Sequence, residues 1–138
     1  KLFFRYMSFR ILQLDGLEVN IKKDNNELFF YFQNANIRKT MDDAEEKTLW
    51  TQDGKIKLTN VSDFQNLELV DYKIESIEIS YDFYTYKNML MLPFLKKGGI
   101  DLKIKFKNED NIININCREI EIILKDNAKY IRHIKKTE

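Results

Sequence analysis

The sequence is poor in the residues on which many enzyme and metal sites are built. Its 138 residues contain one cysteine, one histidine, one proline and four glycines. This excludes an intramolecular disulfide and a zinc site made of several Cys and His ligands. A catalytic nucleophile–base set would have to use His133, which lies in a basic C-terminal stretch that we interpret as solvated. We therefore expect no enzyme activity and no cofactor or metal.

Glycine is also too scarce for a phosphate-binding loop. Gly98-Gly99 precedes a strand pattern rather than a helix, so it matches neither the P-loop nor the dinucleotide fingerprint. We expect a flexible turn at this pair. Cys117 shares the alternation of Ile113 and Ile115, which predicts a small buried hydrophobe rather than a reactive thiol.

Long apolar runs and an excess of one charge are missing too. No run approaches the ~20 apolar residues that span a bilayer. Arg5 and Arg10 interrupt the apolar N-terminal stretch too early for a secretory signal, so we expect a cytoplasmic protein. The 23 Lys and Arg residues balance 22 Asp and Glu residues, for a net charge of +1. This balance does not favour a nucleic-acid partner, although a locally basic face stays open.

The dominant positive signal is the alternation of apolar and polar residues between Glu75 and Phe106. This period of two is typical of antiparallel strands with one face on a core and one face in water. The predicted core residues of this region are Ile77, Ile79, Tyr81, Phe83, Ile100, Leu102, Ile104 and Phe106.

Short polar segments between apolar ones predict three hairpin turns, at Asp24-Asn25-Asn26, at Gln52-Asp53-Gly54-Lys55 and at residues 108–111. The Asp-Gly pair is the strongest of these signals. The segment from Leu28 to Phe32 is apolar on both faces, which indicates a central strand.

The C-terminal segment has two interpretations. Apolar residues occupy odd positions up to Cys117 and even positions from Ile120 to Leu124, and such a change of phase requires a bulge or a bend in a strand. The alternative is a helix. We favour a strand through Leu124, and both alternatives stay open from Ala128 to Lys136.

Together, these patterns predict a single all-β domain over residues 1–138. We expect an antiparallel β-sandwich or partly closed barrel of about 8–10 short strands, with at most one or two short helices.

The acidic residues suggest little chemistry. Glu78 and Asp82 lie on one face of their predicted strand, and a hydrolase could combine such carboxylates from different strands. We prefer a solvated face on which they oppose Lys103 and Lys105. The acidic segment Met41 to Lys47 lacks the EF-hand spacing, and we expect an exposed loop or a single helical turn rather than a calcium site.

Two features favour contact surfaces. If the strand of Glu78 continues, Tyr84 and Tyr86 share its polar face, and exposed tyrosines suit protein interfaces. The candidate partner-contact residues are Glu78, Asp82, Tyr84, Tyr86, Lys103 and Lys105. The apolar run from Met89 to Leu95 is a partner or membrane contact if exposed; if buried, as we favour, it is a strand that ends at Pro93.

The sequence therefore predicts a non-catalytic protein-binding module, such as an inhibitor, an immunity-type protein, an adaptor or an assembly subunit. The alternatives are a barrel that carries a small ligand or lipid and, less favoured, a carboxylate-dependent hydrolase. The partner is expected to be another protein, and homo-oligomerisation is left open.

Overall fold

The computed structural model describes residues 9–40, 47–62 and 67–135. These residues contain nine strands and no helix, which confirms the predicted all-β class. The longest strands exceed the predicted short lengths, and β9 alone has 23 residues. The strands are β1 (Phe9–Gln13), β2 (Glu18–Asp24), β3 (Glu27–Thr40), β4 (Lys47–Thr59), β5 (Asp71–Tyr81), β6 (Tyr84–Lys87), β7 (Met89–Leu92), β8 (Leu95–Phe106) and β9 (Ile112–Ile134).

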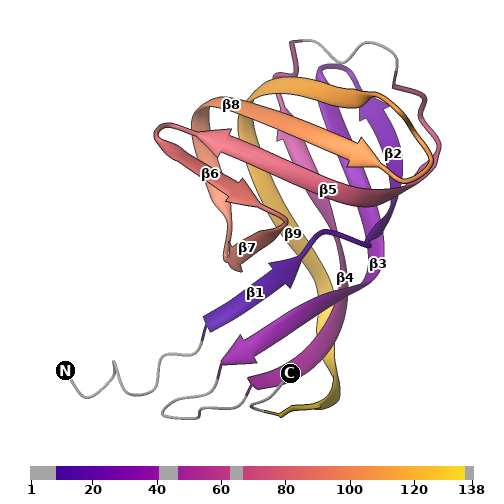
Figure 1. The fold of residues 1–138 in the computed structure, drawn as a ribbon. Helices are drawn as coiled ribbons and strands as arrows, with labels where there is room; N and C mark the ends of the chain where they lie inside the picture. The colour runs from indigo at the N-terminus through magenta and orange to yellow at the C-terminus, as the bar shows by residue number, and fades with distance from the viewer. Residues whose placement is uncertain (1–8, 41–46, 63–66, 136–138) are drawn as a thin grey trace.

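Six strands form a partly closed antiparallel barrel in the upper part of Figure 1. Their pairings run in the order β2–β5–β8–β9–β4–β3, and β3 also pairs with β2, which completes the ring. The link between β2 and β5 is short, from Glu18↔Lys73 to Asn20↔Asp71. A single sheet that curls onto itself therefore replaces the two packed sheets of a sandwich.

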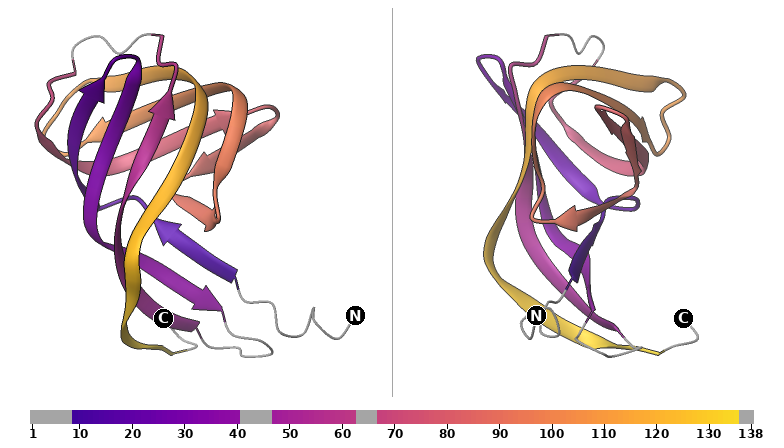
Figure 2. Two further views of the ribbon diagram at one scale, coloured as in Figure 1. Left: turned by 180° about the vertical axis from the view of Figure 1, so that it is seen from behind. Right: turned by 90° about the vertical axis from the view of Figure 1, so that its left-hand side faces the viewer.

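The strands β3, β4 and β9 run past the barrel into an open part of the same sheet. There, residues 35–40 of β3, 47–52 of β4 and 129–134 of β9 lie side by side, and β1 and then β7 extend the sheet beyond β3. We call this part the extension sheet. It curves below the barrel in both views of Figure 2.

The barrel meets the extension sheet at irregular positions of β3 and β4. The β3–β4 register shifts between Phe32 and Ala35, and the β4–β9 register shifts between Thr51 and Asp53. The backbone amide of Asn34, which has a φ of 54°, donates a hydrogen bond of 2.8 Å to Oδ1 of Asp53. Such bulges bend strands and increase their twist.

The predicted hairpin turn at Asp53-Gly54 is wrong, because β4 runs without a break through both residues. Glycine is required at position 54 for another reason, which is that the backbone of β9 passes very close to it. A Cβ atom there would overlap the carbonyl oxygen of Ile123 and lie 3.1 Å from Cα of Leu124 and 3.1 Å from the ring of Phe32. The two other predicted hairpins, β2–β3 and β8–β9, are confirmed.

The predicted turn at Gly98-Gly99 is also wrong, since both residues lie inside β8. Together they oppose one residue of β9, Arg118, and so form a bulge. At this place β9 changes phase, with Cys117 and Ile120 both buried. The strand interpretation is thus confirmed through residue 124. β9 continues to residue 134, so the helical alternative for residues 128–134 is wrong as well.

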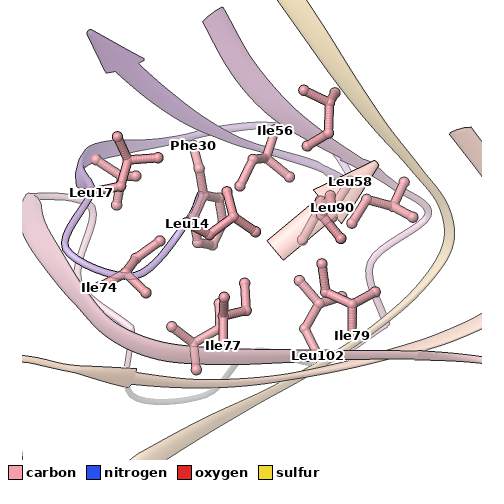
Figure 3. Packing of buried hydrophobic residues seen from close by; sticks show 14 of the residues in the cluster. Leu14, Leu17, Phe30, Ile56, Leu58, Ile74, Ile77, Ile79, Leu90 and Leu102 are labelled. Carbon is pink, nitrogen blue, oxygen red and sulfur yellow. The ribbon is translucent and has the colours of Figure 1, made fainter. Parts of the chain in front are cut away.

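The core fills the barrel. Figure 3 shows side chains from β3, β4, β5, β7 and β8, and from the segment between β1 and β2, that converge on one interior, among them Phe30, Ile56 and Leu102. Of the predicted core residues in β5 and β8, all the isoleucines, Leu102 and Phe106 are at most 1% exposed. The segment from Leu28 to Phe32 is central, between β2 and β4, as predicted.

The prediction for Phe83 is wrong, because this side chain is 97% exposed. The alternation of β5 ends at Tyr81, which is half-buried, and Asp82 and Phe83 form the turn into β6. Asp82 has a φ of 59°, which suits a tight turn and not a continuing strand.

Candidate functional site

Of the charged residues in the predicted contact set, Glu78 lies on β5 and Lys103 and Lys105 lie on β8, whereas Asp82 lies in the turn after β5. Glu78 is the direct register partner of Lys103 and forms an ion pair of 3.5 Å with Lys87. Lys105 forms an ion pair of 3.6 Å with Glu75. Exposed pairs of this kind contribute little stability and give no sign of a catalytic carboxylate.

The two tyrosines of the predicted set do not share the face of Glu78. The turn at Asp82 sends the chain back along β5, so that Tyr86 lies opposite Ile79. Tyr86 packs against the core, and its ring meets that of Phe94 edge to face at 5.1 Å. Tyr84 is 68% exposed. The predicted single contact face is therefore wrong, and of the two tyrosines only Tyr84 offers much surface to a partner.

Strand β7 forms an open edge of the sheet, since its strand partner among the described residues is β1. Leu90 and Leu92 are buried, whereas Met89 and Met91 are 44% and 54% exposed. The apolar run is therefore buried on one side and exposed on the other. It ends before Pro93, as predicted.

The hydrogen-bond pattern shows which backbone groups of β7 face outward. The amide of Leu14 donates to the carbonyl of Asn88 at 2.8 Å, in register with β1 and β7. Alternate residues of an antiparallel strand direct their backbone groups to the same neighbour. Leu90 therefore faces β1, whereas Met89 and Met91 direct their N–H and C=O groups towards the open edge.

The opposite edge of the extension sheet, β9 after its last contacts with β8, differs from β7. It carries Lys125 and Lys129, and its pairing with β4 is irregular near Asp126, which has a φ of 62°. Lysines and bulges are the features by which natural sheets block an added strand. β7 carries neither, and only its length of four residues limits what can pair with it.

The described residues contain no group of three or more His, Cys, Asp or Glu side chains suited to a metal ion. Burial raises the pKa of the Cys117 thiol to about 11, and the carboxylate of Asp101 adds to the rise. A thiol with so high a pKa is a poor nucleophile. The prediction that Cys117 is a buried hydrophobe is confirmed.

The acidic residues of the 41–46 segment lie outside the described residues. The described part of the chain forms no helix that could cross a membrane.

A pocket of about 1140 Å³ opens at one mouth of the barrel, where β5 and β9 begin and β8 ends. Tyr72 and Phe106 stack along its wall with ring centroids 4.3 Å apart. The hydroxyl of Tyr72 accepts a hydrogen bond of 3.2 Å from the amide of Glu68. Ile112 and Val70 add exposed apolar surface at the rim. This pocket lies outside the packed interior of the barrel.

Comparisons with known proteins give no relative on which to base a function: no protein-family model, no curated protein and no solved structure matches the chain. The site therefore has to be argued from its own geometry.

The sequence singled out the run from Met89 to Leu95 as a contact surface if exposed, but it did not distinguish the exposed Met89 and Met91 from the buried leucines between them. In a run of consecutive apolar residues, the inward and outward positions look alike, so the period of two is hidden. The signal that could have pointed to this edge is residue type, because methionines alternate with leucines. Methionine is common at adaptable contact surfaces.

Proposed function

We propose that this protein is a non-catalytic protein-binding module that receives an extended segment of a partner at the β7 edge. The observation that carries the proposal is the outward backbone of Met89 and Met91 on an edge strand that has no lysine and no bulge. An added strand gains affinity from main-chain hydrogen bonds and specificity from alternate side chains. We also propose a cytoplasmic location, on the ground that the single cysteine forms no disulfide.

The surroundings of β7 favour an apolar partner segment. β7 itself carries no charged residue, and its two exposed side chains are methionines, which adapt to irregular apolar surfaces. In Figure 1 the β5–β6 hairpin projects from the same side of the molecule as β7. Its turn presents Phe83 and Tyr84, which are 97% and 68% exposed. Isolated aromatic side chains of this kind act as anchors when a partner covers them.

The test compares the wild-type chain with the variant Met89→Lys/Met91→Lys, because lysine on an edge opposes strand addition. Ile112→Lys is the matched control, since Ile112 is 57% exposed but lies at the barrel mouth. Partners are captured from the native cells by crosslinking, and their segments are then titrated against the purified chains. We expect the double variant to bind at least about tenfold more weakly and the control to bind normally.

Hydrogen exchange then locates the bound segment. Exchange at the amides of Met89 and Met91 should slow when the segment binds, since an added strand pairs with them. Equal binding by the double variant, or protection confined to other strands, would contradict the proposal. A dimer that forms at high concentration and is lost in the same variant would identify the occupant as a second copy of this chain.

The pocket at the barrel mouth supports a second candidate function, the binding of a small ligand. It combines the aromatic wall of Tyr72 and Phe106 with a polar rim that includes Lys73 and Lys107. Such a mixture of apolar lining and a few polar groups is common in ligand sites. A ligand screen followed by thermal shift tests this candidate: Tyr72→Ala should abolish the shift, and a shift that survives would place the ligand elsewhere.

A further inference from the structure

The extension sheet has an inner face that continues the interior surface of the barrel. Two neighbouring rows of cross-strand partners cover it. One row runs across β1, β3, β4 and β9 as Leu12, Ile37, Trp50 and Tyr130, and the next row runs as Arg10, Lys39, Thr48 and His133. Leu12 and Ile37 are buried under the barrel. The aromatic side chains of the first row therefore lie on β4 and β9, and the cations of the second row lie on the neighbouring strands β1 and β3.

The aromatic part of this face is held in place. The indole Nε1 of Trp50 donates a hydrogen bond of 2.8 Å to the hydroxyl of Thr48. The ring of Tyr130 meets that of Trp50 edge to face at 5.3 Å, and the ammonium of Lys39 lies 5.6 Å from the centroid of Trp50. Tyr130 remains 54% exposed. A fixed aromatic pair thus lies within reach of a cation.

Charge is segregated onto the extension sheet. Its described strand residues, 9–13, 35–40, 47–52, 89–92 and 129–134, include no Asp or Glu. Their cations are Arg10 and Lys39 on the inner face, and Arg38, Lys47, Lys129 and Arg132 on the opposite face. The net charge of +1 for the whole chain conceals this arrangement, because the excess of carboxylates lies elsewhere.

We propose that the inner face of the extension sheet binds single-stranded nucleic acid, with bases stacked on Tyr130 and Trp50 and phosphates near Arg10 and Lys39. Aromatic platforms beside a cationic surface are the usual means of binding single strands without sequence preference. An acidic peptide would satisfy the cations but would leave the exposed ring of Tyr130 unused. A nucleotide supplies a planar base and a phosphate together, so the observations favour it.

The test uses the complete chain and a fluorescein-labelled oligouridylate of about 12 nucleotides, within the site sizes of small single-strand-binding folds. Binding is followed by anisotropy at several salt concentrations. Because Trp50 is the only tryptophan, its own emission reports directly on the proposed site. We expect saturable binding at low salt, accompanied by a change in Trp50 emission.

Three variants separate the contributions of phosphate contacts and base stacking to the affinity. Arg10→Gln/Lys39→Gln should lower the salt slope of log K by about 1.4, since each phosphate contact on a single strand contributes about 0.7. Tyr130→Ala should weaken binding about fivefold or more through loss of stacking. Lys103→Gln removes a charge from the barrel and should leave the affinity unchanged within about twofold. Melting curves of each variant confirm that it is folded.

Several outcomes would overturn the proposal. They are the absence of binding at low salt, binding without a change in Trp50 emission, and equal affinity of the Tyr130→Ala variant. Equal or tighter binding of a duplex, or of polyglutamate, would show a general preference for polyanions. Similar affinities for oligouridylate and oligothymidylate are expected, because base stacking and phosphate contacts do not involve the ribose 2′-hydroxyl. Failure here leaves the proposed protein binding intact, because that proposal rests on the outward backbone of Met89 and Met91 and not on these side chains.

Discussion

Replacement of Gly54 by alanine tests the close contact that joins β4 to β9 beside the bend of the sheet. The added Cβ would overlap the carbonyl oxygen of Ile123 and would meet Cα of Leu124 at 3.1 Å. Both atoms belong to the backbone of β9, so no side-chain rotation can relieve the overlap. The ring of Phe32, also at 3.1 Å, closes the remaining direction. The two strands would have to separate locally.

The expected magnitude follows from this geometry. Overpacking a core usually costs about 1–3 kcal/mol. Since the obstacle is backbone on one side and a buried ring on the other, we expect Gly54→Ala to lower the free energy of unfolding by about 3 kcal/mol or more. That is a large part of the ~5–15 kcal/mol that stabilises a typical domain. Without the close contact, the same change in a strand would stabilise the protein by about 0.4–1 kcal/mol.

Two other glycines serve as controls. A Cβ at Gly99 would lie 3.7 Å from the guanidinium of Arg118, an ordinary contact, so Gly99→Ala should be neutral or slightly stabilising. A Cβ at Gly16 would meet no atom within 4 Å, but the φ of Gly16 is +83°. Gly16→Ala should therefore lower the free energy of unfolding by about 1–2 kcal/mol, because alanine disfavours this left-handed backbone conformation. Urea unfolding, followed by Trp50 fluorescence, gives the free energy of unfolding of each of the three variants. A Gly54→Ala protein as stable as Gly99→Ala would refute the close contact.

Three further predictions rest on burial. The Cys117 thiol should react with a disulfide reagent only as fast as the protein unfolds, and denatured protein should react at once. The pKa of this thiol is about 11 in the folded protein, above its ordinary value of 9.0. Its contribution to the free energy of unfolding should therefore be present below pH 9 and lost as the pH rises to 11. In urea titrations, Cys117→Ala should lack this loss of stability. Ile104→Asp should lower the free energy of unfolding by about 3 kcal/mol or more, because Ile104 is buried. Phe83→Ser should change it by less than about 0.5 kcal/mol, because Phe83 is exposed. Equal melting temperatures for the two variants would contradict the assigned burial.

The sequence was most informative for strands that have one buried face and one solvent-exposed face. In β5 and β8, polar residues separate the apolar ones, and Ile77, Ile79, Ile100 and Leu102 lie where the period of two puts them. This pattern follows from the geometry of a single strand and needs no knowledge of its neighbours. For that reason the all-β class could be predicted, together with much of the core.

The two wrong turn predictions share a physical cause, which is that the deciding contact is remote in sequence. Asp53-Gly54 has the composition of a hairpin turn, yet β9 passes so close to Gly54 that only glycine fits. Gly98 and Gly99 likewise form a bulge opposite Arg118 instead of a turn. Local turn signals describe what a segment can do. The partner strand decides whether the segment does it.

The charge arrangement of the extension sheet leads to a last prediction, which concerns stability instead of binding. Arg10 lies directly opposite Lys39, and no described residue forms an ion pair with either. Like charges placed directly across a strand pair destabilise a sheet by about 0.2–1 kcal/mol. Arg10→Gln should therefore raise the free energy of unfolding by that amount at low salt.

Salt distinguishes this effect from a change in packing. High salt screens the repulsion between exposed charges, so the gain from Arg10→Gln should disappear there. Lys103→Gln is the control, because Lys103 faces Glu78 and its loss should bring no gain at any salt concentration. An Arg10→Gln protein that is less stable than wild type at low salt would show that Arg10 stabilises the fold. If the variant is instead more stable, the free protein keeps two opposed cations at a cost, as expected for a face shaped by an anionic ligand.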